Sequence, residues 1–358
     1  MVRGTLRGIP KALLFCLLLA ALAGLSLGQS FVLDLPRQSQ HALVSQRVGI
    51  TDITINYHRP LVAGRKVWGG LVPYGDVWRS GANENTTITF SDPVMIEGKA
   101  LDRGTYGLHM IPTADEWTII FSKNSTSWGA FTYKQDEDAL RVTVKPHAVD
   151  MHEALTYDFD DVKPDSTVVV LEWEKVAVPF KVGVDVHGVV EASLKKQLRG
   201  LGQYTWEGWD DAANYLLTEK TDLDDALVYA NKSIENEDRY DNETTKSKVL
   251  LALNRKDEAA TAQKKALDLA TPLQLHIYAR GLQGEKRNDE AFVIFRDNAQ
   301  KHPDMWFVHS GLARMFCSQG KYDDAAKEMK LALAGAPENQ KTYVDGLVKK
   351  LEAKQDIN

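Results

Sequence analysis

The chain has 358 residues, with 43 Lys and Arg against 49 Asp and Glu, so its formal net charge at pH 7 is −6. This acidic balance argues against nucleic acid as a partner, because phosphate binding depends on clustered Lys and Arg that the chain nowhere concentrates. The length is sufficient for two domains of ordinary size, each with its own core.

The N-terminal segment has the pattern of a secretory signal peptide. Basic residues precede an apolar run over residues 12–27, which ends at small residues. The run is short for a membrane span of about 20 residues, which favours cleavage after Gly28 over the alternative of a retained anchor. We therefore expect residues 1–28 to be a signal peptide, and the mature chain to be exported, periplasmic or secreted, without a membrane segment. Cleavage would leave Cys317 as the only cysteine, so no intramolecular disulfide is expected.

Short runs of alternating apolar residues predict strands in the next region. In the first run, Ile53, Ile55 and Tyr57 share one face. Few residues separate the runs, and no long helix intervenes, so residues 29–187 are predicted to form an antiparallel β-sandwich or jelly roll. The predicted strands are residues 49–57, 86–90, 94–96, 105–111, 117–121, 141–144, 155–159, 167–173 and 176–184.

The connection over residues 57–84 combines tryptophans, tyrosines, cations, acids, glycines and prolines, which is typical of an ordered irregular loop. Aromatic faces with fixed Arg and carboxylate groups suit a sugar, a peptide end or a carboxylated small molecule. The alternative is that the tryptophans fill the core and Arg–carboxylate pairs fix the loop. The candidate ligand-binding residues are Arg59, Trp68, Tyr74, Asp76, Trp78, Arg79, Asn83 and Glu84.

Acid–base catalysis is a second interpretation of the same loop. Asp76 or Glu84 could carry a proton with help from His58 or His109, as in a hydrolase acting on an envelope or extracellular glycan or peptide. No complete catalytic motif accompanies these residues, so an enzyme is the less favoured hypothesis.

A metal site is not predicted, and neither is a cofactor. Two histidines and two acids lie close together at His147, Asp150, His152 and Glu153. Their position between strands provides no fixed face of ligands, in contrast to the spacing of helical metal motifs.

Several short motifs give residues 35–185 a distinctive resemblance. They are the run over residues 71–86, Gly98-Lys99, Gly104-Thr105-Tyr106, Ile111-Pro112, Glu116-Trp117 and Trp128-Gly129. The region resembles an exported bacterial family named domain of unknown function 2911. The resemblance implies a domain boundary and a cell envelope location, but no activity, substrate or catalytic residue.

Four alanines after this domain recur with the period of a two-helix repeat. Their spacings are 33, 32 and 34 residues, and they are Ala226, Ala259, Ala291 and Ala325. Mostly small residues recur seven positions later, where two helices would approach each other closely. We expect a helical linker over residues 188–205 and helical repeats over residues 206–354.

The unit over residues 311–337 resembles a tetratricopeptide repeat most closely, through Ala313, Phe316, Gly320, Tyr322, Ala325, Ala332 and Pro337. The second repeat departs from the family pattern at Gln263 and Pro272, so it is expected to be distorted. The resemblance implies four repeats, a capping helix and a concave groove that suits a peptide or a partner helix. A stabilising spacer or a dimerisation surface is the alternative.

Together these patterns favour an exported binding or assembly protein whose repeats dock a protein or peptide partner. The alternatives are the envelope hydrolase and a purely structural scaffold.

Overall fold

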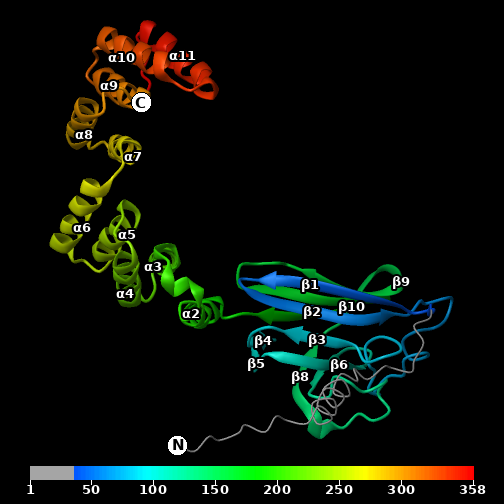
Figure 1. Ribbon diagram of the computed structural model, residues 1–358. Coiled ribbons are helices and arrows are strands. Elements are labelled where there is room, and N and C mark those ends of the chain that lie inside the picture. The colour runs from blue at the N-terminus through cyan, green and yellow to red at the C-terminus, as the bar shows by residue number, and fades with distance from the viewer. Residues whose placement is uncertain (1–35) are drawn as a thin grey trace, which may run out of the picture. The chain divides into compact units, whose positions relative to one another are not determined.

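The structure, a computed structural model, describes residues 36–358. The predicted signal peptide lies outside the described residues. The chain divides into two compact units, which meet between Val190 and Glu191. The first unit contains the β-strands, and the second contains the helical repeats (Figure 1).

The first unit, called here the β-unit, contains two antiparallel sheets. The first sheet has the order β1-β2-β3-β6-β7-β8, with bounds β1 Gln40–Val48, β2 Thr51–Arg59, β3 Thr87–Phe90, β6 Gly104–Pro112, β7 Trp117–Ser122 and β8 Asp138–Val144. The second sheet has the order β5-β4-β10-β9, with bounds β5 Lys99–Leu101, β4 Val94–Ile96, β10 Ser166–Gly183 and β9 His147–Asp160.

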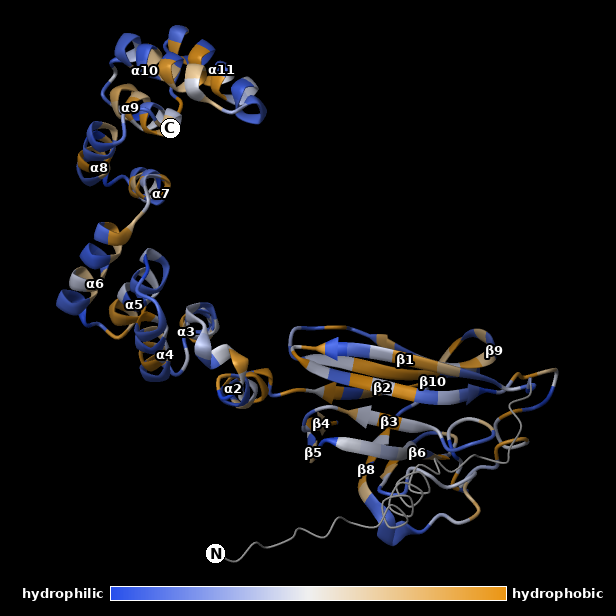
Figure 2. Cartoon of the chain, viewed as in Figure 1, coloured by the Kyte–Doolittle hydropathy of each residue, from blue (hydrophilic) through white to orange (hydrophobic). Residues whose placement is uncertain are grey.

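One hydrophobic core draws side chains from both sheets, as expected for a sandwich. On β2, Ile53, Ile55 and Tyr57 are buried while Asp52 and Asn56 are exposed, because successive side chains of a strand point to opposite faces. Figure 2 shows the hydrophobic residues concentrated along β2 and β10. The predicted antiparallel β-sandwich is therefore confirmed.

Several strand predictions differ from the structure. Strand β9 begins at His147 and not at residue 155, so His147, Asp150, His152 and Glu153 lie within a strand and not between strands. The segments 167–173 and 176–184 form one long strand, β10, whose pairing with β9 shifts register around Glu174. That residue has φ 56°, and such an irregularity interrupts the alternation that the sequence shows. The strands β1 and β5 were not predicted, because β1 is a half-exposed edge strand and β5 has only three residues.

The connection between β4 and β5 is a tight hairpin over residues 96–99. Ile96 pairs with Lys99, which leaves Glu97 and Gly98 as the two turn residues. Both have positive φ, 48° and 78°, as a type I′ hairpin turn requires.

The second unit, called here the helical unit, is built from antiparallel helix pairs. Helix α2 (Val186–Gln197) crosses the boundary between the units, and a short 3₁₀ helix, Leu201–Tyr204, follows it. The remaining helices are α3 Trp206–Glu219, α4 Leu223–Asn236, α5 Tyr240–Ala252, α6 Lys256–Leu269, α7 Pro272–Gly284, α8 Asn288–Lys301, α9 Trp306–Ser318, α10 Tyr322–Gly335 and α11 Glu338–Glu352.

The four recurring alanines lie on the second helix of each pair, on α4, α6, α8 and α10, and all are buried. A larger side chain at these positions would separate the helices, so the alanine period sets the spacing of the pairs. Gly311 shows the same constraint, because a Cβ there would lie 2.6 Å from the ring of Phe295. The predicted helical-repeat fold is confirmed, with α11 after the fourth pair.

Pro272, which departs from the repeat pattern, begins α7. Its neighbour Thr271 is the N-cap, and Thr271 and Gln274 form a capping box. Helices α6 and α7 make few contacts at this junction, because α7 packs mainly against α8 and α9. The second and third repeats are therefore less tightly joined than the other neighbouring repeats. Among the described residues, no helix has both the length and the apolar character that a membrane crossing requires.

Candidate functional site

The loop between β2 and β3 is fixed to both sheets by backbone contacts. Trp78 exchanges two 2.8 Å hydrogen bonds with Met110 of β6, and the amide of Gly75 donates to the carbonyl of Pro112. At the other sheet, the amide of Val62 donates to the carbonyl of Glu153 on β9. The loop is therefore an ordered part of the fold, as its composition indicated.

Four tryptophans meet beneath this loop. Trp68 makes edge-to-face contacts with Trp78, Trp117 and Trp173, at ring-centroid distances of 5.7, 4.7 and 5.6 Å. The rings of Trp78 and Trp173 are stacked, 5.9 Å apart with planes 20° from parallel. Trp68 and Trp173 are 6% and 1% exposed and belong to the core, and the edge of Trp173 lines a cavity together with Trp78.

This cavity, called here the tryptophan cavity, has a volume of about 720 Å³. It is lined by Gln38, Ser39, Pro60, Leu61, Ala63, Arg65, Leu71, Val72, Trp78, Arg79, Gly81, Ala82 and Trp173. A second cavity of about 420 Å³ shares Trp78 and Arg79 and adds Asp76 and Phe131. Both volumes lie in the range of small-molecule sites.

Arg79 lines both cavities and stands out through its hydrogen bonding. Its side chain is half-buried, its Nε is buried without a partner, and its guanidinium makes no hydrogen bond with any described residue. The guanidinium carbon lies 5.6 Å from the ring centroid of Trp128. Burial lowers the pKa of Arg79, and the charge of Glu84 only partly opposes this effect. A half-buried cation without a hydrogen-bond acceptor is suited to an anionic ligand.

Glu84 lies at a different, more polar hollow of about 520 Å³, with Arg37, His41 and His58. Its carboxylate accepts a hydrogen bond from Arg37 at 2.5 Å and lies 3.4 Å from His58 Nε2. Burial is the largest single influence on the pKa of Glu84 and raises it. The hydrogen bond from Arg37, a backbone hydrogen bond and the charges of His58 and Arg37 together outweigh burial, so the pKa of Glu84 is lowered. Burial also lowers the pKa of His58, against the attraction of Glu84.

The remaining candidates stabilise the loop or stand at its surface. Arg59 donates to the carbonyl of Leu155 and to the hydroxyl of Thr156, at 2.9 and 2.6 Å. Asn83 has φ 58° and donates to the carbonyl of Ser39 at 3.1 Å. Tyr74 is half exposed and packs over Gly69. The cavities thus gather Trp78, Arg79 and Asp76, and not Arg59, Trp68, Tyr74 or Asn83.

Arg59, Arg79, Asp76 and Glu84 do not pair with one another in the described structure, since Glu84 pairs with Arg37. Asp76 and Glu84 also line different cavities. Hydrolysis by two carboxylates requires them to face one substrate. The geometry therefore favours binding over this catalytic interpretation.

Three residues of the site were missed by the sequence interpretation. Trp173 comes from β10, Trp128 from the β7–β8 connection and Arg37 from the segment before β1. Trp128 was noted only as part of a family motif. Sequence spacing has no signal for such contacts, because the order of strands in the sheets brings the residues together.

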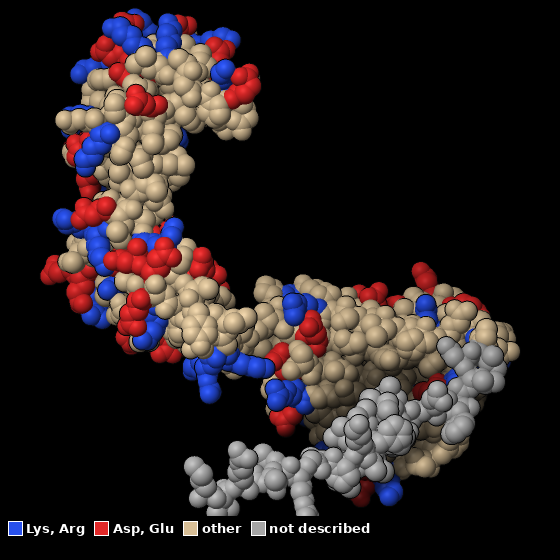
Figure 3. All heavy atoms as spheres, viewed as in Figure 1, with Lys and Arg blue, Asp and Glu red and all other residues tan. Residues whose placement is uncertain are grey.

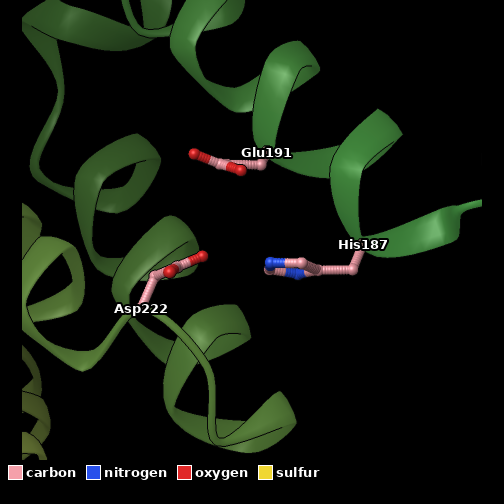
Figure 4. A group of neighbouring side chains, drawn as sticks. All are labelled: His187, Glu191 and Asp222. Atoms are coloured by element: carbon pink, nitrogen blue, oxygen red, sulfur yellow. The ribbon is translucent and has the colours of Figure 1, made fainter.

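The polar group on β9 is engaged in structural contacts. His152 Nδ1 lies 3.5 Å from the carboxylate of Glu172, and Glu153 accepts a hydrogen bond from the amide of Ala63 at 2.8 Å. A different trio, His187, Glu191 and Asp222, offers one ligand atom each within 4.8 Å (Figure 4). These three residues belong to two different units, so they do not define a site.

The comparison with family models agrees with the resemblance predicted for the first unit. Residues 39–182 match the model of a family described as protein of unknown function DUF2911. No curated protein matches the chain. Among solved structures, the chain is similar to the crystal structure of YrrB, described as a TPR protein with an unusual peptide-binding site. The identity is 14% and the TM-score 0.28, over 45% of this chain and 84% of that chain.

Proposed function

We propose that this protein is an exported binding protein, whose β-unit holds a small anionic ligand and whose helical unit holds a protein or peptide partner. Support comes from a formed cavity in one unit and a repeat array in the other. Repeat arrays of stacked helix pairs offer extended binding surfaces.

The observation that carries the ligand proposal is the guanidinium of Arg79 at the wall of the tryptophan cavity, which has no hydrogen-bond acceptor in the part of the chain that the structure describes. The stacked rings of Trp78 and Trp173 form an apolar wall beside it. A carboxylate on a planar or sugar-like body complements both features, because Arg binds carboxylates strongly and indole rings pack against flat apolar faces. The ligand class is therefore a carboxylated small molecule or an acidic sugar of a glycan.

Ligand binding is tested with two probe pairs of similar shape and different charge, benzoate against benzyl alcohol and glucuronate against glucose. Tryptophan fluorescence of the full chain should respond to an acid and not to its neutral counterpart. The Arg79→Gln variant should lose at least about tenfold in affinity, since a charge-assisted hydrogen bond contributes about 1.5–3 kcal/mol. Arg103→Gln, at an exposed position away from the cavities, is the control and should bind normally. Equal binding by both variants would contradict the assignment.

Partner binding by the repeats is tested by photo-crosslinking. An amino-acid crosslinker at Ile277, exposed on the first helix of the third pair, should capture a discrete partner from an envelope extract. The same crosslinker at Val293, exposed on α8, is the matched control and should capture no discrete partner. Identical capture at both positions would indicate non-specific contact.

Export is tested by the N-terminal sequence of the protein isolated from a bacterial envelope fraction. Cleavage should leave Gln29 as the first residue. An uncleaved chain in the membrane fraction would contradict export with removal of the signal peptide.

A further inference from the structure

One side of the helical unit carries the first helices of its pairs. Helices α7 and α9 contact each other there, and α9 contributes Arg314, Cys317 and Ser318. In the view of Figure 3, charged side chains crowd over α4, α6 and α10, while the surface over α7 and α9 is largely uncharged. This surface of α7 and α9 is called here the inner groove.

The last residues of the sequence return to this groove. After α11 ends at Glu352, Lys354 takes φ 55° and the chain reverses direction. The end of the chain then lies against α9 (Figure 1). Ile357 is 8% exposed and belongs to the same apolar cluster as Ala313 and Leu347. A short extended segment is thus anchored by one buried aliphatic side chain.

Polar contacts along the segment resemble those of a docked peptide. Arg314 donates a hydrogen bond to the carbonyl of Ile357, and the thiol of Cys317 donates to the carboxylate of Asp356 at 3.2 Å. The side-chain amide of Asn358 donates to the carbonyl of Arg314 at 3.3 Å and to the hydroxyl of Ser318 at 3.0 Å. From α7, Gln283 donates to the side-chain oxygen of Asn358 at 3.5 Å. The side chains of all three residues and the backbone carbonyl of Ile357 therefore contact the groove.

The groove has one group that this segment leaves incompletely satisfied. Arg314 is 2% exposed, its Nε is buried without a partner, and no carboxylate pairs with it among the described residues. Its terminal nitrogens donate to the carbonyl of Ile357 and, at 3.4 Å, to the hydroxyl of Tyr343, so both acceptors are neutral. Burial and the neighbouring charge of Arg280 lower the pKa of Arg314, because both disfavour its cationic form. A carboxylate beside the guanidinium would offset both effects and supply the anionic acceptor that Ile357 and Tyr343 do not.

We propose that residues 356–358 occupy the inner groove as an internal ligand, and that a partner presents an extended peptide with an acidic and an aliphatic residue to the same place. The proposal rests on the proposed partner-binding function. It adds the chemistry of the partner peptide and names residues 356–358 as the segment that competes with this peptide. A partner carboxylate that reaches Nε of Arg314 would make a contact that the internal segment lacks.

Cys317 provides a direct measure of groove occupancy. Its thiol is buried under Asp356, and Cys16 is the only other cysteine in the sequence. The full chain carrying Cys16→Ser therefore reports on this one thiol. Its rate of alkylation by N-ethylmaleimide, followed by mass spectrometry, should rise at least about tenfold when the chain is shortened to end at Lys354, because local opening no longer limits access. Ile357→Ala should give an intermediate rate.

The matched control is Leu331→Ala, at an exposed aliphatic residue of α10, which should leave the alkylation rate unchanged. The shortened chain should retain its helical circular dichroism and its cooperative unfolding. An unchanged alkylation rate would overturn the proposal, and so would loss of the last repeat, since the segment would then be part of the core.

Competition by a peptide completes the test. The peptide Lys-Gln-Asp-Ile-Asn, at millimolar concentration, should slow alkylation of the shortened chain toward the rate of the full chain, because a tethered segment has an effective concentration on the order of millimolar. The peptide with Asp in place of Ile should not. Failure of the peptide to protect the thiol would overturn the internal-ligand proposal. Failure of the Ile277 crosslinker to capture a partner would instead contradict the partner-binding function.

Discussion

The β-unit has one continuous core built from large side chains, whereas the helical unit, within the described residues, has several smaller cores centred on alanines. Trp117, Trp173 and Phe180 are among the largest fully buried side chains of the β-unit. In the helical unit, the buried alanines belong to separate clusters along the array. A change in the β-unit should therefore affect the whole unit, whereas a change in the array should act on one pair and its neighbours.

The largest effect is expected for Trp173→Ala. The side chain is 1% exposed and contacts both Trp68 and Trp78, so its removal leaves a large void. We expect the free energy of unfolding of the β-unit to fall by about 3–5 kcal/mol. Denaturant unfolding followed by tryptophan fluorescence should show this loss, while the helical circular dichroism at 222 nm keeps its midpoint. A simultaneous shift of both signals would contradict independent cores.

The pH dependence of the helical unit should be the next largest effect. Burial, with the charges of Arg280 and Arg314, lowers the pKa of His276 to about 4. Because the unfolded chain titrates near pH 6.5, it binds more protons than the folded chain between pH 6.5 and 4. The contribution of neutral His276 to the free energy of unfolding is therefore complete above pH 6.5. As the pH falls from 6.5 to 4, up to about 3 kcal/mol of this free energy is lost.

The measurement is the unfolding midpoint at 222 nm as a function of pH. His276→Gln removes the titrating group, so the slope between pH 6.5 and 4 should flatten in the variant. An equal slope in both proteins would show that His276 does not control the acid sensitivity of this unit.

Overpacking one repeat tests the local nature of the array. Ala291 is fully buried on α8, and Ala291→Leu should cost about 1–3 kcal/mol by forcing α7 and α8 apart. Hydrogen exchange should increase in α7 and α8 and remain unchanged in the β-unit. The control is Val293→Leu, at an exposed position of the same helix, with no expected change. Increased exchange across the whole chain would argue against nearest-neighbour coupling.

The smallest effect is expected for Glu84→Gln at the polar hollow. The ion pair with Arg37 is solvent-accessible, and exposed pairs typically contribute less than about 1 kcal/mol. The unfolding midpoint of the β-unit should be nearly unchanged. A large loss of stability would mean that this pair, and not the tryptophan core, fixes the loop.

The fold was largely predictable, because periodic patterns depend on neighbouring residues. The alternation of apolar and polar residues located β2, β4, β6 and β7 closely. The alanine period located the second helix of each of the four pairs. The pattern failed where geometry is irregular or exposure is high, at the bulge near Glu174 and at the edge strand β1.

The candidate site was predictable only in part. The loop was identified from its composition, and Trp78, Arg79 and Asp76 do line its cavities. The roles of the individual loop residues were not predictable, since Arg59 forms a hydrogen bond to β9 and Trp68 lies in the core. Composition records which groups are present, whereas burial and hydrogen bonding decide which of them remain accessible.

The sequence by itself determined the two classes of structure in this protein, since strand alternation and helix period are local properties of the chain. Only the tertiary structure placed Trp173 beside Trp78 and brought Ile357 onto α9, and it left Arg79 without a hydrogen-bond acceptor among residues 36–358. The physical reason is that these contacts join residues far apart in sequence, and their formation depends on sheet order and chain reversal, which residue spacing does not record.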